Sequence, residues 1–241
     1  MNRREMLRLC AAAGLAGFAG NAMDAREDIV EATQAVDHLL LGVSDLDTGD
    51  TFIDLLTGIR PAFGGVHPGR GTRNALVSLG GRQYLEIIAP DPEQSEYRFQ
   101  IDVRTMKSPK LITWAAASQD LDALAAKGRA GGAPPAAPAD GSRARPDGTL
   151  LKWKTLGVAS TFARDGVEPV PFFIQWAPDS PHPSQDAPKG CELASLEIAH
   201  PDPAGLGRLL KQWGIDGRVK QADKAILRAT IKTPRGPVYL S

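Results

Sequence analysis

The sequence lacks the features that are typical of proteins that bind nucleic acid or membranes. Its 28 Lys and Arg residues are matched by 28 Asp and Glu residues, so no excess of positive charge is available for nucleic acid or an anionic membrane surface. No apolar run reaches the roughly 18 residues needed to span a bilayer. These absences argue against nucleic acid and against a membrane span, and they favour a small-molecule partner.

Cysteine and the common nucleophile motifs are also scarce. The chain has only 2 cysteines, and Cys10 falls in the N-terminal segment described next, so Cys191 has no intrachain partner and a disulfide framework is excluded. There is no Gly-x-Ser-x-Gly nucleophile elbow. The glycine-rich segment 64–74 does not end in Gly-Lys-Ser/Thr, which excludes a phosphate-binding loop of that type.

The N-terminal segment, residues 1–25, differs from the rest of the chain. Arg3, Arg4 and Arg8 precede a mild Leu/Ala/Gly stretch, and small residues suited to cleavage follow up to Ala22. The segment resembles a twin-arginine export signal and predicts an exported, periplasmic protein. The alternative is an ordinary amphipathic N-terminal helix, in which case the protein would be cytoplasmic.

A strand, helix and hairpin pattern begins after a short polar linker. "AVDHLLLGV" predicts a strand, Asp45 and Gly58 predict the start and the end of a helix, and Gly80-Gly81 predicts the turn of a hairpin. Residues 36–91 therefore form one expected βαβββ module.

The same pattern recurs along the chain. A second module is expected over residues 109–179, with Asp120 at the start of its helix as Asp45 is in the first. Its surplus length is a Pro/Gly/Ala-rich segment, residues 130–146, which predicts an exposed insertion. A weaker, partial third module is expected over residues 190–241. The repeat predicts an α+β fold built from βαβββ modules.

Strand alternation singles out a histidine and a carboxylate in the first module. Successive strand residues face opposite sides, so His38 lies opposite the apolar face of Leu39 and Leu41, and Glu86 lies opposite Leu85 and Ile87. One imidazole and one carboxylate facing a cavity would suit a divalent metal such as Zn, Ni, Mn or Fe. The alternative is that His38 hydrogen-bonds a strand neighbour and that Glu86 is a solvated edge residue.

Three segments carry a resemblance to a known family: "DHLLLGVSDLD", "GGVHPGRGTRNALVSLGGRQYLEIIAPD" and "PFFIQWAPDSPHP". With them the chain resembles the glyoxalase-like branch of the vicinal oxygen chelate superfamily. The resemblance implies paired βαβββ modules that form a half-open barrel, with helices on the outer face and metal ligands on the first and last strand of each module. His38 and Glu86 match two ligand positions, whereas the second module has Thr113 and Gln175 at the corresponding positions. Gln175 can coordinate a metal through its carbonyl oxygen.

The remaining site residues come from the glycine-rich segment and from neighbouring strands. His67 is a further candidate ligand or, together with Glu86, an acid and base; the alternative is that its segment is only a mobile turn. Arginines there would hold an anionic substrate. The predicted substrate-binding residues are Arg70, Arg73, Asn74, Tyr84, Thr113 and Phe173.

These observations lead to three alternative functions. The first is a metal-assisted lyase or isomerase that acts on a small oxygen-rich metabolite, with His38, Glu86 and Gln175 as ligands. The second is a metal-free protein that binds a small molecule, as resistance proteins of the superfamily do. The third is a protein that has kept the fold and lost the site. A homodimer is compatible with each of them.

Overall fold

The computed structural model describes residues 29–132 and 134–241. The expected export signal, residues 1–25, therefore lies outside the described residues. The described chain begins with a short strand and one helical turn, β1 (Val30–Glu31) and α1 (Ala32–Ala35). No helix of the described part is long and apolar enough to cross a membrane.

Two βαβββ modules follow, as the sequence predicts. The first consists of β2 (Val36–Gly42), α2 (Leu46–Thr57), β3 (Ala62–His67), β4 (Thr72–Ser78) and β5 (Tyr84–Pro90). The second consists of β6 (Lys110–Ala117), α3 (Leu121–Ala130), β7 (Ala139–Ala144), β8 (Leu150–Leu156) and β9 (Phe172–Trp176).

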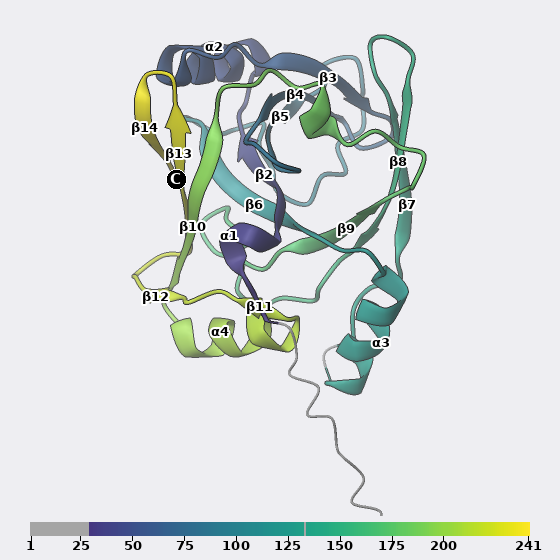
Figure 1. Ribbon diagram of the computed structural model, residues 1–241, viewed down its shortest axis with the longest axis vertical. Helices are drawn as coiled ribbons and strands as arrows, with labels where there is room; N and C mark the ends of the chain where they lie inside the picture. Colours follow the sequence, from purple (N-terminus) through teal and green to yellow (C-terminus); the bar gives the residue numbers. More distant parts are fainter. Residues whose placement is uncertain (1–28, 133) are drawn as a thin grey trace, which may run out of the picture.

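The two modules share one mixed, strongly curved sheet. Its strand order is β3-β4-β5-β2-β6-β9-β8-β7, so in each module the first strand pairs in parallel with the last, and the two modules meet through the antiparallel pair β2–β6. The edge strands β3 and β7 contact each other without strand pairing, which nearly closes the barrel (Figure 1). This arrangement confirms the predicted α+β fold of paired modules.

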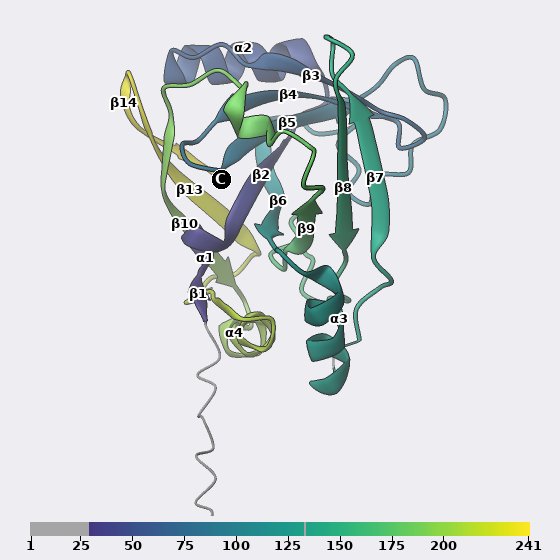
Figure 2. The ribbon, with the colours of Figure 1, turned by 45° about the vertical axis from the view of Figure 1, so that its right-hand side comes forward.

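The helices start where the sequence predicts and cover the outside of the sheet. The side chain of Asp45 accepts a hydrogen bond from the Thr48 backbone N–H at the start of α2, and Gly58 ends the helix with a left-handed φ of 77°. Asp120 caps α3 in the same way. Helix α2 packs on β4 and β5, and α3 packs on β8 and β9, so the concave face of the sheet is left for a cavity (Figure 2).

The C-terminal part forms a second sheet. After the one-turn helix η1 (Pro183–Gln185) come β10 (Glu192–His200), α4 (Pro203–Gln212), β11 (Ile215–Asp216), β12 (Lys220–Gln221), β13 (Ile226–Thr233) and β14 (Gly236–Leu240). The order of the four-stranded sheet is β12-β10-β13-β14, so the first strand pairs with β13 and not with the last strand. The order of elements follows the expected third module, but the strand pairing differs from that of the other two. Leucine and isoleucine side chains of this sheet and leucines of α4, together with Trp213 just after the helix, share one hydrophobic core with the barrel.

Helix α2 contains a carboxylate whose ionisation opposes folding. Asp50 is half-buried, one of its oxygens is buried without a hydrogen-bond partner, and burial raises its pKa to about 6. The unfolded chain therefore loses this proton at lower pH than the folded chain does, so stability falls as pH rises from about 4 to about 6. We expect Asp50→Asn to raise the free energy of unfolding by about 1 kcal/mol near neutral pH, after allowance for solvent screening, and to have little effect near pH ~4.

Urea denaturation of wild type and variant at the two pH values measures this effect. The control is Asp47→Asn, which removes an exposed carboxylate of the same helix. Equal stability of Asp50→Asn and wild type near neutral pH would contradict the prediction.

Candidate functional site

The concave face of the barrel encloses a cavity of about 100 Å³. This is smaller than the roughly 300–1,000 Å³ of a typical ligand site, so the cavity suits a small metabolite. Its polar side chains come mainly from the first module, and its aromatic side chains come mainly from the second. The lining consists of His38, Leu40, His67, Arg70, Thr72, Asn74, Tyr84, Glu86, Ile88, Phe99, Arg143, Trp153, Thr155, Phe172, Ile174 and Trp176.

Glu86 is the carboxylate of this cavity. One of its oxygens, Oε1, accepts a hydrogen bond of 2.6 Å from Asn74 Nδ2 and lies 3.5 Å from His67 Nε2; the other, Oε2, lies 3.4 Å from His38 Nε2. Burial acts to raise the pKa of Glu86, but His38, His67 and the Asn74 hydrogen bond outweigh it and hold the pKa below its ordinary value. Glu86 is therefore a buried carboxylate that is ionised at neutral pH, with two imidazole rings and one amide donor beside it.

Both histidines near Glu86 are oriented through their other ring nitrogen. His38 Nδ1 lies 2.8 Å from Asp37 Oδ1, and His67 Nδ1 lies 2.9 Å from Thr72 Oγ1. Burial lowers the pKa of His67, which favours its neutral form. The ring of His38 also stacks on Tyr84 with 4.6 Å between the centroids. These contacts leave both Nε2 atoms facing Glu86.

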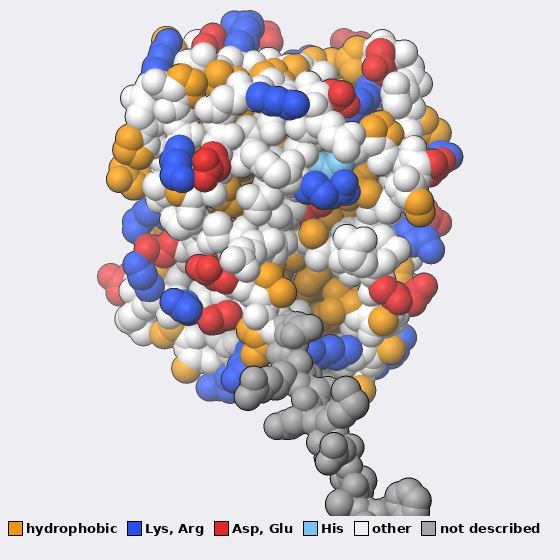
Figure 3. Space-filling model, viewed as in Figure 1, with side chains coloured by type: hydrophobic (Ala, Val, Ile, Leu, Met, Phe, Trp, Pro, Cys, Tyr) orange, Lys and Arg blue, Asp and Glu red, His pale blue; other side chains and the backbone are white. Residues whose placement is uncertain are grey.

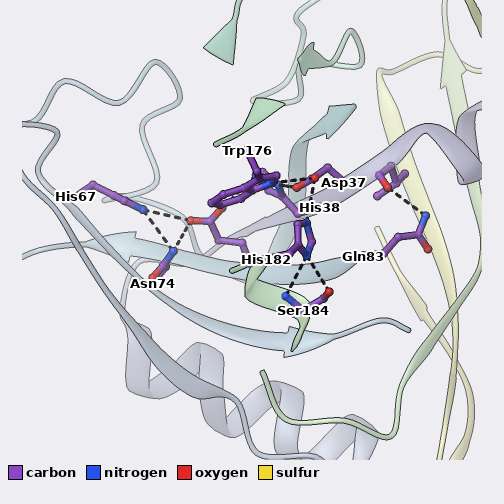
Figure 4. A network of polar contacts seen from close by, with 10 residues as sticks. Asp37, His38, His67, Asn74, Gln83, Trp176, His182 and Ser184 are labelled. Carbon is purple, nitrogen blue, oxygen red and sulfur yellow. Dashed lines mark hydrogen bonds and ion pairs between the residues drawn. The ribbon is translucent and has the colours of Figure 1, made fainter. Parts of the chain in front are cut away.

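Asp37 joins His38 to a second part of the site, which contains the buried His182 and the partly buried Trp176. Its Oδ2 accepts a hydrogen bond of 3.0 Å from Trp176 Nε1 and lies 3.1 Å from His182 Nε2. Burial acts to raise the pKa of Asp37, but contacts with His182 and His38 lower it to about 2. Figure 4 shows this network, with His67 and Asn74 at one end and His182 and Ser184 at the other.

The position of Asp37 follows from an irregularity in strand pairing. The register of β2 against β6 shifts between Val36 and His38, so Asp37 has no partner residue in β6. Such a bulge re-aims side chains, and here two consecutive residues both take part in the site. Regular alternation predicts the face of His38 correctly but gives no reason to select Asp37 or His182, so neither residue was predicted from the sequence.

Arg143 is a third functional candidate that was not predicted from the sequence. It lies on β7, inside the segment 130–146 that was predicted to be only an exposed insertion, yet its side chain is buried and lines the cavity. Burial lowers the pKa of its guanidinium, and Glu86 acts in the opposite direction. The prediction of a wholly exposed segment is therefore wrong at this strand, because the edge contact of β7 with β3 turns one side chain into the barrel.

Six of the residues singled out from sequence lie together around the cavity. They are His38, His67, Arg70, Asn74, Tyr84 and Glu86. On the face shown in Figure 3, a histidine and a basic side chain lie together beside hydrophobic side chains. The structure thus brings together the first-module residues that were expected to form a site.

Four other residues singled out from sequence do not line the cavity. Phe173 is buried in the main core against Trp213, and Gln175 accepts a hydrogen bond from the Leu121 backbone N–H on the helix side of the sheet. Arg73 lies on the strand face opposite Asn74, near the carboxylates of α2. Thr113 pairs with Leu40 and is buried, but it is not a lining residue.

The strand register explains these differences in the second module. His38 pairs with Tyr84, and the equivalent pair is Ala115 with Phe172, so Ile174 occupies the position equivalent to Glu86. His38 lies seven residues before the helix-capping Asp45, whereas Ala115 lies only five residues before Asp120. Counting back from the helix start therefore selects Thr113 in place of Ala115. A one-residue error at the end of the module selects Gln175 and Phe173, which face the opposite side.

The donor set does not fit the four-ligand metal site that the resemblance implies. The second module contributes Ala115 and Ile174 where ligands would be required, and Glu86 Oε1 already accepts a hydrogen bond from Asn74. Within residues 29–132 and 134–241, no group of three or more His, Cys, Asp or Glu side chains is placed to hold a metal ion. Gln175, which was expected to be a ligand, faces away from His38 and Glu86.

Gly64 supplies the space in which Asn74 and Arg143 meet. A Cβ at this position would lie 2.4 Å from Asn74 Oδ1 and 2.8 Å from Arg143 Nη1, closer than real Cβ contacts allow. We therefore expect Gly64→Ala to lower the free energy of unfolding by about 1–3 kcal/mol through overpacking.

Thermal and urea denaturation test this prediction. The control is Gly207→Ala, because a Cβ at Gly207 on α4 meets nothing within 4 Å. The control should be neutral or slightly stabilising, since alanine favours helix. A Gly64→Ala protein as stable as the wild type would show that the site has more room than these distances allow.

Comparison with known proteins gives the family. The protein-family model for the glyoxalase-like domain matches residues 36–214 of this chain. A hypothetical protein from Staphylococcus aureus has a similar solved structure, with a TM-score of 0.64 and 16% identity, covering 86% of this chain and 98% of that chain. A methylmalonyl-CoA epimerase from Mycobacterium tuberculosis is more distant, with a TM-score of 0.42 and 19% identity, covering 61% of this chain and 91% of that chain. No curated protein matches. Since the matched model spans most of the chain and both barrel modules, the protein belongs to the glyoxalase-like domain family of the vicinal oxygen chelate superfamily.

Proposed function

We propose that the protein is an isomerase or lyase that removes a proton from a carbon atom of a small, oxygen-rich metabolite, with Glu86 as the base. The observation that carries the proposal is a buried, ionised carboxylate in a cavity lined by polar and aromatic side chains, with two histidines directed at it. Titratable groups of this kind, held by specific partners in a cleft, are concentrated at functional sites.

The proposed step uses only residues of the cavity. A carbon–hydrogen bond next to a carbonyl group breaks, the proton moves to a carboxylate oxygen of Glu86, and the electron pair remains on the substrate as an enolate. Arg70 and Arg143 line the same cavity and would stabilise the enolate charge. Return of the proton to another position or face gives an isomerase, and loss of a neighbouring group gives a lyase.

Metal-assisted chemistry is a second candidate. The observation in its favour is that His38 and His67 each direct Nε2 at Glu86 while Asp37 and Thr72 hold Nδ1, as outer partners of metal-bound histidines do. A divalent ion on these residues would act as a Lewis acid on substrate oxygens. Among the described residues these three side chains are not placed to hold a metal ion as they lie, so this candidate requires them to move and Asn74 to release Glu86 Oε1. Binding of a small molecule without any reaction is the remaining alternative.

Proton NMR in deuterated buffer tests the proposal. Small hydroxy- and oxo-compounds such as hydroxyacetone, dihydroxyacetone, lactate and pyruvate are incubated with wild-type protein and with Glu86→Gln. We expect the wild type to exchange a carbon-bound proton for deuterium in at least one compound, and Glu86→Gln to do so far more slowly. Binding of these compounds without exchange would contradict the proposed chemistry and would support the alternative of small-molecule binding without reaction.

A further inference from the structure

Two polar atoms of the barrel interior are buried and unpaired at the same place. Arg143 Nη1 and Asn74 Oδ1 are both buried, and among the described residues neither has a hydrogen-bond partner. Both lie close to the position of a Cβ on Gly64, at 2.8 Å and 2.4 Å from it. A buried guanidinium nitrogen and a buried amide oxygen without partners are each costly, so this site is built at the expense of stability.

The guanidinium of Arg143 lies at the same cavity as Glu86, the proposed base. Its side chain lines the cavity that contains Glu86, and only 4% of the residue is exposed. Gly64 and Gly65 of β3 leave room for its guanidinium, since a Cβ on either would lie within 3.0 Å of Nη1. Arg143 of β7 thus places its guanidinium inside the barrel at the point where the edge strands β3 and β7 contact each other.

We infer that Arg143 binds a carboxylate group of the molecule on which Glu86 acts. Among the described residues, the Arg143 side chain forms no ion pair and its Nη1 has no acceptor, although its charge interacts with that of Glu86, so its hydrogen-bond donors remain for a ligand. A guanidinium binds a carboxylate through two parallel hydrogen bonds, and this interaction is strongest where water is excluded. Asn74 Oδ1 beside it would accept a hydrogen bond from a hydroxyl of the same molecule. The inference rests on the proposed function and narrows its substrate class to small carboxylic acids, hydroxy acids among them.

The tryptophan residues of the protein provide a direct readout. Trp153 and Trp176 line the cavity, whereas Trp114 and Trp213 are buried in the main core and serve as internal references. The ligands are glycolate, lactate and malonate, each paired with its neutral amide, and the indole N–H signals are followed by NMR during titration. We expect at least one carboxylate to shift the signals of Trp153 and Trp176 saturably, and its amide not to do so.

Substitution of Arg143 completes the test. Arg143→Met should weaken carboxylate binding by about 10–100-fold, the value of a charge-assisted hydrogen bond. It should also leave the melting temperature unchanged or raise it, because an unpaired buried charge is removed. Arg143→Lys keeps the charge but cannot form two parallel hydrogen bonds, so it should bind the carboxylate with intermediate affinity. The control is Arg208→Met on α4, whose side chain is exposed.

The outcomes separate this inference from the proposed function. Carboxylate binding that Arg143→Met leaves unchanged would overturn the role of Arg143, and so would a lack of response to all three carboxylates. A lower melting temperature with unchanged affinity would make Arg143 purely structural. None of these results affects deuterium exchange that depends on Glu86, which is measured with neutral compounds as well.

Discussion

Asp37→Ala is expected to lower the free energy of unfolding by about 3–5 kcal/mol, the cost of breaking a buried charged network by removing one partner. The side chain is 2% exposed and is shared by His38, His182 and Trp176. Without it, three nitrogen groups lose their acceptor, and two of them, on His38 and His182, are buried. The loss should extend to function, because His38 loses the contact that fixes its ring beside Glu86.

The same substitution has a defined pH dependence. Because the pKa of Asp37 is lowered from 3.8 to about 2, its ionised form stabilises the fold above pH ~4 and that contribution disappears as pH falls towards 2. About 2 kcal/mol of the difference between wild type and Asp37→Ala should therefore vanish over this range. Urea denaturation at about pH 7 and about pH 2, the folded-state pKa of Asp37, measures it. The control is Asp102→Ala, because Asp102 also has a pKa of about 2 but is exposed and screened by water.

A wild-type protein and an Asp37→Ala protein of equal stability at neutral pH would contradict this account. Such a result would mean that His182 and Trp176 find other partners, and that the ring of His38 is oriented by its stacking on Tyr84 alone.

Glu86→Gln is expected to slow carbon–hydrogen exchange by about 10²–10⁴-fold, the usual contribution of a positioned general base. Glutamine keeps the shape of the side chain and can still accept the hydrogen bond from Asn74, but it cannot take up a proton. The fold should therefore be retained while the reaction is lost. Melting temperature and exchange rate are measured on the same preparation.

The matched control is Glu96→Gln, because the Glu96 side chain is 63% exposed and pairs with Arg98 at the surface. It should leave both quantities unchanged. An exchange rate in Glu86→Gln within about twofold of the wild-type rate would remove Glu86 from the chemistry, since a general base contributes far more than that.

The sequence predicted the parts of this protein that depend on local pattern. The capping residues Asp45 and Asp120, the hairpin turn and the recurrence of βαβββ units all depend on short-range chemistry, and the structure confirms them. The face of His38 and Glu86 also followed from alternation within single strands. These are the features for which neighbouring residues decide the structure.

The parts that failed depend on long-range pairing. A bulge between Val36 and His38 brings Asp37 into the site, and a shorter connection before α3 shifts the second module by two residues. Arg143 was missed because the composition of its segment is typical of an exposed loop, whereas contact between β7 and β3 decides its burial. Neither strand register nor barrel closure is encoded in one short window of sequence.

The most direct test of the central claim is the deuterium exchange rate of wild-type protein that has been stripped of metal with a chelator and checked by elemental analysis. The account predicts that exchange persists in the stripped protein, depends on Glu86, and continues at neutral pH, where the lowered pKa of Glu86 keeps the carboxylate ionised. Exchange that stops on stripping and returns with Zn²⁺, Ni²⁺, Mn²⁺ or Fe²⁺ would contradict it and would establish the metal-assisted alternative.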